Sequence, residues 1–149
     1  MRTKRIFSFS AFSAVFIASY VGVQPSAQAF SFSDEMAGCY ARKIKGPATL
    51  KIEKEGGQYF VSMPHRGKWD RAEKPMAFLP PEEIQKLFKQ DSDKVESMLS
   101  IPGGMVSIVR FKKGAVLKGK HPESDYFVRT LFSSGPAFPT DKSCDKPQD

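Results

Sequence analysis

Few side chains of the kinds that build active sites occur in this chain. Its 149 residues include two cysteines, two histidines and one tryptophan. Cys39 and Cys144 are too far apart in sequence to form a metal-binding motif, and the histidines, His65 and His121, stand alone. The sequence therefore predicts no metal site and no cofactor.

Catalytic motifs are missing as well. The chain has no Gly-x-Ser-x-Gly turn for a serine nucleophile, no His-Glu-x-x-His motif and no glycine-rich phosphate loop. A cysteine nucleophile is not expected either, because both cysteines should be oxidised. Catalytic groups can also assemble from distant residues, so a hydrolase stays open as an alternative to a non-enzymatic protein.

The longest uncharged apolar run lies at the N-terminus. Residues 6–23 carry no charge and follow a cationic start, Pro25 ends the run, and Ala27-Gln28-Ala29 has the spacing that signal peptidase reads. We interpret residues 1–29 as a signal peptide that is cleaved after Ala29, which predicts a periplasmic or secreted protein. The run is too short and too rich in serine for a retained membrane anchor.

A lipoprotein is the alternative for this region, because Ala37-Gly38-Cys39 is a small-small-Cys triplet. Asp34 and Glu35 separate that triplet from the apolar run, whereas a lipobox closes such a run directly. The sequence therefore favours cleavage near Ala29 over acylation of Cys39.

The charge balance is only mildly basic without the signal peptide. The whole chain has 23 basic and 16 acidic residues, and three bases lie within residues 1–29. The remainder carries a formal charge of +4. With no strong basic stripe and no recognition motif, nucleic acid is not an expected partner. A protein or an anionic envelope component fits this balance better.

Cys39 and Cys144 are both retained after cleavage, and an even cysteine count in an oxidising compartment favours pairing. Closing a loop of this length destabilises the unfolded chain by about 4–5 kcal/mol in the entropic model. We therefore predict a Cys39–Cys144 disulfide, the alternative being two free buried thiols.

The clearest local pattern is a β-hairpin. Residues 49–53 alternate polar and apolar side chains, residues 58–63 are rich in aromatic and β-branched side chains, and Gly56-Gly57 supplies the turn. A second hairpin is predicted around Pro102-Gly103-Gly104. Its second strand, residues 105–111, is apolar on both faces and should be covered on both. Further strands are predicted at residues 39–44, 115–118 and 126–132.

One short helix is predicted over residues 80–89, with prolines and acids at its start and lysine near its end. Residues 133–149 contain three prolines and are predicted to form an irregular tail. The sequence thus predicts one mainly β domain over residues 30–149. We expect a small antiparallel sheet, barrel-like or a sandwich, of about six strands with one inserted helix.

The triplet Gly38-Cys39-Tyr40 resembles the Gly-x-Trp opening of lipocalin-like barrels, with Tyr40 in the place of the tryptophan. The resemblance extends over these three residues alone. It implies a barrel interior that carries an apolar small molecule.

The first candidate binding surface is the loop after the first hairpin. An aromatic anchor and cations that grip anionic groups are typical of binding edges. The candidate residues are His65, Arg66, Lys68, Trp69 and Arg71. The alternative is that Trp69 packs onto the core.

The second candidate is the densest basic stretch, which has no acidic residue between positions 110 and 120. Its cations are Arg110, Lys112, Lys113, Lys118 and Lys120. The stretch predicts a contact for phosphorylated lipid, anionic glycan or an acidic protein, unless it is a solvated edge that lysine keeps soluble. We expect the Trp69 loop to contribute more to binding than this edge.

Export, small size, a disulfide-stapled β scaffold and the lack of catalytic motifs together predict a non-enzymatic binding module. One concrete form is an inhibitor or immunity-type partner of a secreted enzyme or toxin. The small-molecule carrier is the second hypothesis.

Overall fold

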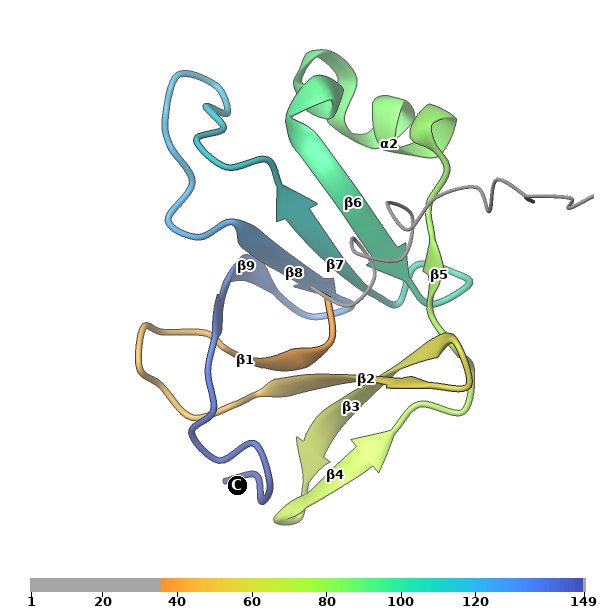
Figure 1. The fold of residues 1–149 in the computed structure, drawn as a ribbon, viewed down its shortest axis with the longest axis vertical. Helices are drawn as coiled ribbons and strands as arrows, with labels where there is room; N and C mark the ends of the chain where they lie inside the picture. Colours follow the sequence, from red (N-terminus) through yellow and green to blue (C-terminus); the bar gives the residue numbers. More distant parts are fainter. Residues whose placement is uncertain (1–35, 149) are drawn as a thin grey trace, which may run out of the picture.

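The computed structural model describes residues 36–148, which form one curled antiparallel sheet, a half-barrel, with a short helix packed against it (Figure 1). The predicted signal peptide, residues 1–29, lies outside the described residues. The mainly β class is confirmed, but the sheet has nine strands rather than about six.

The chain runs through two groups of strands. The first group is β1 (Gly38–Ala41), β2 (Leu50–Glu55), β3 (Gln58–His65) and β4 (Lys68–Arg71). The second is β5 (Ala77–Phe78), β6 (Val95–Ser100), β7 (Val106–Phe111), β8 (Tyr126–Thr130) and β9 (Ser134–Pro139). Helix α2 (Pro81–Phe88) and the 3₁₀ helix η1 (Lys89–Lys94) connect β5 to β6.

The strand order is β4-β3-β2-β1-β9-β8-β7-β6-β5. Nearly all neighbours follow each other in sequence, and the exception is β1 with β9, which pairs Tyr40 with Pro139. Met76, just before β5, also pairs with Tyr59 of β3. The segment that leads into β5 therefore contacts both groups of strands, which lie close together in the curled sheet.

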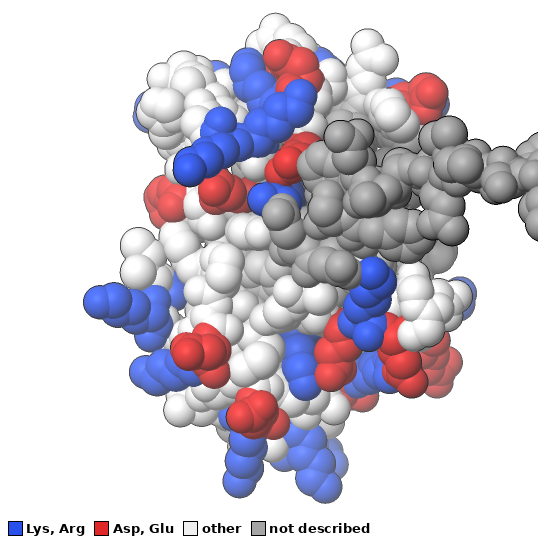
Figure 2. Space-filling model, in the orientation of Figure 1, with Lys and Arg blue, Asp and Glu red and all other residues white. Residues whose placement is uncertain are grey.

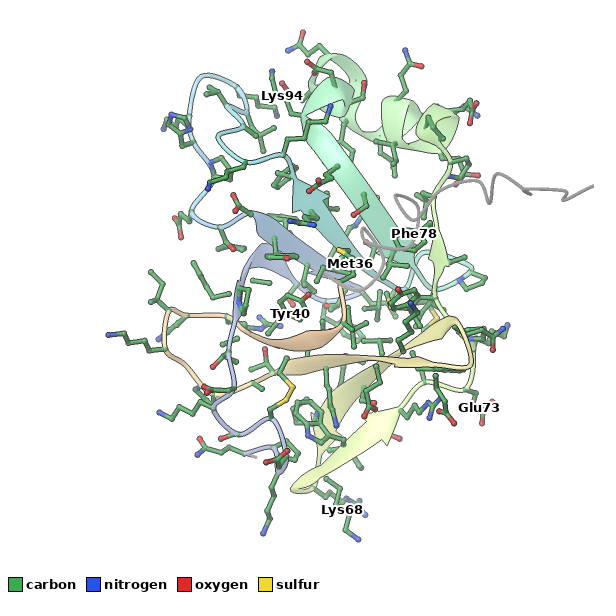
Figure 3. All side chains as sticks on the ribbon, viewed as in Figure 1. Met36, Tyr40, Lys68, Glu73, Phe78 and Lys94 are labelled. Carbon is green, nitrogen blue, oxygen red and sulfur yellow. A yellow bond between two sulfur atoms is a disulfide. The ribbon has the colours of Figure 1, made fainter. Side chains whose placement is uncertain are left out.

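The inner face of the half-barrel holds the main core. Alternate residues of the strands point into it, as the period of a strand requires. The buried members are Met36, Tyr40, Leu50, Ile52, Tyr59, Val61, Met76, Leu99, Ile101, Val106, Ile108 and Ala137. Figure 3 shows Met36 and Tyr40 in the space between β1 and strands β6–β8. Each fully buried Leu, Ile or Val contributes about 1.5–3 kcal/mol.

A smaller core lies on the outer face, between the sheet and α2. It contains Val95, Met98, Val109, Phe111 and Ala115. Ile84 and Phe88 of α2 pack against it, and the Phe88 ring meets Phe111 edge-on at 6.1 Å. Strand β7 is therefore covered on both faces, as the apolar run at residues 105–111 predicts.

The predicted disulfide is confirmed: Cys39 on β1 is bonded to Cys144, with their Cα atoms 5.7 Å apart. The bridge holds the segment after β9 against the first group of strands, where the Ala48 amide also donates to the Lys142 carbonyl.

Two predicted elements are wrong. Residues 133–149 are not all irregular, because β9 forms there and lies between β1 and β8. This strand was not predicted because prolines within a segment argue against a strand. Residues 115–118 form no strand, only a bridge between Leu117 and Lys120. Gly114 and Gly119 adopt positive φ angles of 75° and 79°, and these turns break the strand.

Candidate functional site

The predicted Trp69 loop is the tip of the β3–β4 hairpin. Arg66 and Gly67 occupy the turn with φ angles of 50° and 69°, as a tight two-residue turn requires. Four of the five predicted residues line a shallow hollow of about 420 Å³ here, namely His65, Arg66, Lys68 and Trp69, together with Asp70. In Figure 2 basic side chains gather at the lower end of the molecule, and Figure 3 places Lys68 there.

Trp69 and Arg71 have partners within the protein. The indole N–H of Trp69 donates to the Cys144 carbonyl at 2.7 Å, so this side chain is partly buried against the C-terminal segment. Arg71 pairs with Glu55 at 2.6 Å, and its guanidinium lies 3.7 Å from the Phe60 ring centroid. Recognition by this tip stays a prediction that would depend on its exposed residues, His65, Arg66 and Lys68.

The predicted basic stretch does not form one surface. Arg110 points to the inner face of β7, pairs with Glu96 at 3.1 Å and lies 5.9 Å from the Tyr126 ring. The exposed lysines belong to the connection between β7 and β8 (residues 112–125), and they are Lys112, Lys113, Lys118 and Lys120. Arg110 is thus engaged within the sheet, whereas the four lysines are exposed to solvent.

A groove that sequence reasoning missed crosses the outer face of β6, β7 and β8. It consists of two adjoining hollows of about 530 and 420 Å³, bounded by α2 on one side and, over the larger hollow, by the 112–125 connection on the other. Both hollows are lined by Leu87, Met98, Ser107 and Arg129. These residues form the centre of the groove.

The floor of the groove follows from strand register. Met98 pairs with Val109, Val109 pairs with Phe127, and Ser107 pairs with Arg129. Directly paired residues point to the same face of a sheet, so a mostly apolar row lies beside one arginine. Because these side chains stand on paired strands, their positions are fixed by the ladder.

The helix forms a half-exposed wall of the groove. Leu87 is 50% exposed, whereas Ile84 and Phe88 on the same helix pack against the outer core. The three form one apolar stripe at positions i, i+3 and i+4 of the helix, yet α2 has no fully buried residue. Leu87 is thus an apolar side chain available to a ligand in the groove.

Arg129 is the exposed cation at the centre of the groove, where the two hollows adjoin. No carboxylate oxygen of residues 36–148 lies within 4.0 Å of its guanidinium. Asp91, the buried acid of the groove, is instead bonded to Lys94 at 2.8 Å. The hydrogen bond to Asp91 raises the pKa of Lys94. Lys118 and Glu123 also line the larger hollow and Glu83 lines the smaller one, and Arg129 is the charged residue that lines both.

Sequence reasoning missed Arg129 because it lies inside a predicted strand. One available signal was that residues 126–140 contain no acid, so no charge within this segment neutralises it. The sequence could not show that Arg129 lies in an open apolar groove, because the groove depends on where α2 packs against the sheet.

Among residues 36–148, no three His, Cys, Asp or Glu side chains are grouped as metal ligands. In the same range no helix has the length and apolarity needed to cross a bilayer. Comparisons with protein-family models, curated proteins and solved structures found no match to this chain.

Proposed function

We propose that this protein is an exported, non-enzymatic binding module that takes an extended segment of another protein into the groove. The observation that carries the proposal is the union of an apolar floor and wall with Arg129, which lacks an acidic partner among the described residues. An arginine in this setting can hold a carboxylate through two parallel hydrogen bonds. The preferred segment therefore combines large apolar side chains with an Asp, a Glu or a C-terminal carboxylate.

The shape of the groove favours a peptide segment over a small molecule. Small-molecule sites enclose most of the ligand surface, whereas this groove extends across three strands and keeps Leu87 half exposed. Two hollows in series suit two side chains of one extended segment, with the carboxylate at Arg129 between them.

The confirmed Cys39–Cys144 bridge is compatible with an oxidising compartment outside the cytoplasm and supports export. An inhibitor or immunity-type partner of a secreted enzyme or toxin remains one concrete form of this function. The carrier hypothesis has less support, because core side chains fill the inner face. The hollow lined by Tyr40, Leu50 and Met63 measures only about 250 Å³.

A random-peptide display library selected on the immobilised protein tests the proposal. Enriched peptides should carry a large apolar residue and a carboxylate. Their affinity should fall about tenfold or more in Arg129→Gln and in Leu87→Ser, a typical loss for an anchor residue. Lys43→Gln is the matched control, because it removes an exposed cation from the β1–β2 loop and should change nothing.

Two results would overturn the groove as the binding site. One is a library that yields no peptide with this pattern. The other is peptide binding that survives Arg129→Gln but is lost in an Arg66→Ser, Lys68→Ser double variant. That second result would identify the β3–β4 tip as the site instead.

A further inference from the structure

The end of the half-barrel where β7 begins and β8 ends exposes large apolar side chains. Phe132 is 96% exposed, Leu131 62% and Met105 50%. Val106 pairs with Thr130 at the end of the β7–β8 ladder, so the β6–β7 and β8–β9 turns lie side by side. We name Met105, Leu131 and Phe132 the apolar tip. Large exposed apolar residues gathered at one end of a sheet are typical of interaction surfaces.

The turn that presents the tip is closed at its base. The Thr130 amide donates to the Ser133 carbonyl at 2.7 Å, and the Ser133 amide donates to Thr130 Oγ1 at 3.1 Å. Leu131 and Phe132 occupy the two positions between these bonds. The backbone bonds therefore hold both side chains outward, away from the core.

The segments at this end of the half-barrel carry basic residues and no acidic ones. Segments 97–122 and 126–140, which contain the two turns, have no acidic residue, and neither does segment 36–52, which pairs with β9 through β1. The Arg42 guanidinium donates to Ser133 Oγ at 2.6 Å, which places a cation at the base of the tip. Exposed apolar side chains next to a cation are suited to a bilayer interface with anionic lipid, where the apolar side chains enter the acyl region and the cation meets the headgroups.

We propose that the apolar tip inserts into the interfacial layer of a bilayer containing anionic lipid, with Arg42 beside the headgroup phosphates. A bilayer fits the shape better than a protein partner does. The tip is a protruding turn without a fixed counterpart, and a fluid interface accepts such a point without a complementary pocket. This surface is separate from the groove, and the inference does not depend on the proposed peptide ligand.

Co-sedimentation with lipid vesicles tests the inference. The exported protein should bind vesicles of phosphatidylcholine mixed with phosphatidylglycerol, should bind less in high salt, and should bind pure phosphatidylcholine poorly. The double variant Leu131→Ser, Phe132→Ser should lose about tenfold or more in affinity, the factor that corresponds to about 1.4 kcal/mol. Val116→Ser is the matched control, since it removes an exposed apolar side chain from the 112–125 connection and should bind as the parent does.

A spectroscopic readout separates insertion from charge attraction. Phe132→Trp should show a blue-shifted emission on anionic vesicles, against the constant signal of Trp69, the only native tryptophan. The inference is overturned if the parent protein does not bind anionic vesicles, if the double variant binds equally well, or if Phe132→Trp shows no shift. Vesicle binding that needs Lys112, Lys113 and Lys118 but not the tip would also overturn it.

Discussion

Two hairpins of this sheet carry an aromatic side chain at or beside the turn, and the fold uses the two rings in opposite ways. Trp69, next to the β3–β4 turn, donates its indole N–H to the Cys144 carbonyl and is partly buried. Phe132, in the β8–β9 turn, is 96% exposed. The difference arises because the disulfide brings the C-terminal segment against the β3–β4 hairpin, whereas the β8–β9 turn stays exposed.

The comparison shows that an aromatic residue near a turn does not by itself indicate a binding site. Each segment has an arginine within three residues of the aromatic residue in sequence. What distinguishes them is whether another part of the chain lies within contact distance. Four stability measurements can break or sharpen this contrast.

The largest effect is expected from removing the Cys39–Cys144 bridge. Reduction should lower the free energy of unfolding by about 2–5 kcal/mol, because the unfolded chain gains freedom and the C-terminal segment is released. Denaturant unfolding with and without reductant measures the loss. Trp69 emission should change on reduction, because its acceptor moves away. A Cys39→Ser, Cys144→Ser variant is the control and should not respond to reductant. Titratable thiols in the oxidised protein would contradict the bridge.

Trp69→Ala should give the next largest loss in the free energy of unfolding, about 2–3 kcal/mol, because packing and one hydrogen bond are lost. Trp69→Phe retains most of the apolar area and should cost about 1 kcal/mol, which isolates the bond to the Cys144 carbonyl. Thermal or denaturant unfolding measures both variants. Equal stability of Trp69→Ala and the parent would show that the ring is not structural and would return it to the candidate binding residues.

Tyr40→Phe should cost about 1 kcal/mol near neutral pH, because the buried hydroxyl donates to the Met36 carbonyl at 2.8 Å. Burial, and secondarily the neighbouring Tyr126, raises the pKa of Tyr40 in the folded protein. Its contribution is therefore complete below the unfolded value of about 10 and is lost as pH rises above it.

Stability of the parent should accordingly fall above about pH 10, and Tyr40→Phe should flatten part of that fall. Burial also raises the pKa of Tyr126, so some alkaline dependence should remain. Urea unfolding at several alkaline pH values measures the slope. A slope identical in parent and variant would argue against a buried Tyr40 hydroxyl.

The smallest change in stability is expected for Phe132→Ser. Its free energy of unfolding should lie within about 0.5 kcal/mol of the parent value, because an exposed side chain makes few contacts that can be lost. Its contrast with Trp69→Ala tests the comparison of the two hairpins directly. A loss above about 1 kcal/mol would mean that Phe132 packs against the protein, and it would remove the basis for membrane insertion.

Sequence reasoning succeeded where the signal was local. The hairpin of β2 and β3, the hairpin of β6 and β7, the helix and the disulfide all follow from alternation, turn glycines, helix-end chemistry and cysteine count. It failed for the short strands β4 and β5, which are too short to show a period. It also failed for β9, which contains Pro136 and Pro139 and pairs on one side with β1, far away in sequence.

The candidate site was less accessible from sequence than the fold. The tip of the β3–β4 hairpin was found as a loop, but the internal contacts of Trp69 and Arg71 were not visible. The groove was not found at all, because its residues come from three strands, a helix and a loop. Their convergence depends on cross-strand register and on where α2 packs.

The amino-acid sequence by itself determined the β class, the two hairpins, the helix and the Cys39–Cys144 pair, because each depends on near neighbours or on counting. Only the tertiary structure decided that β9 completes the sheet, that Arg129 lies in an apolar groove and that Phe132 faces solvent. The physical reason is that exposure and cross-strand neighbours are properties of packing. An aromatic residue beside a turn becomes partly buried or exposed according to whether a distant segment covers it.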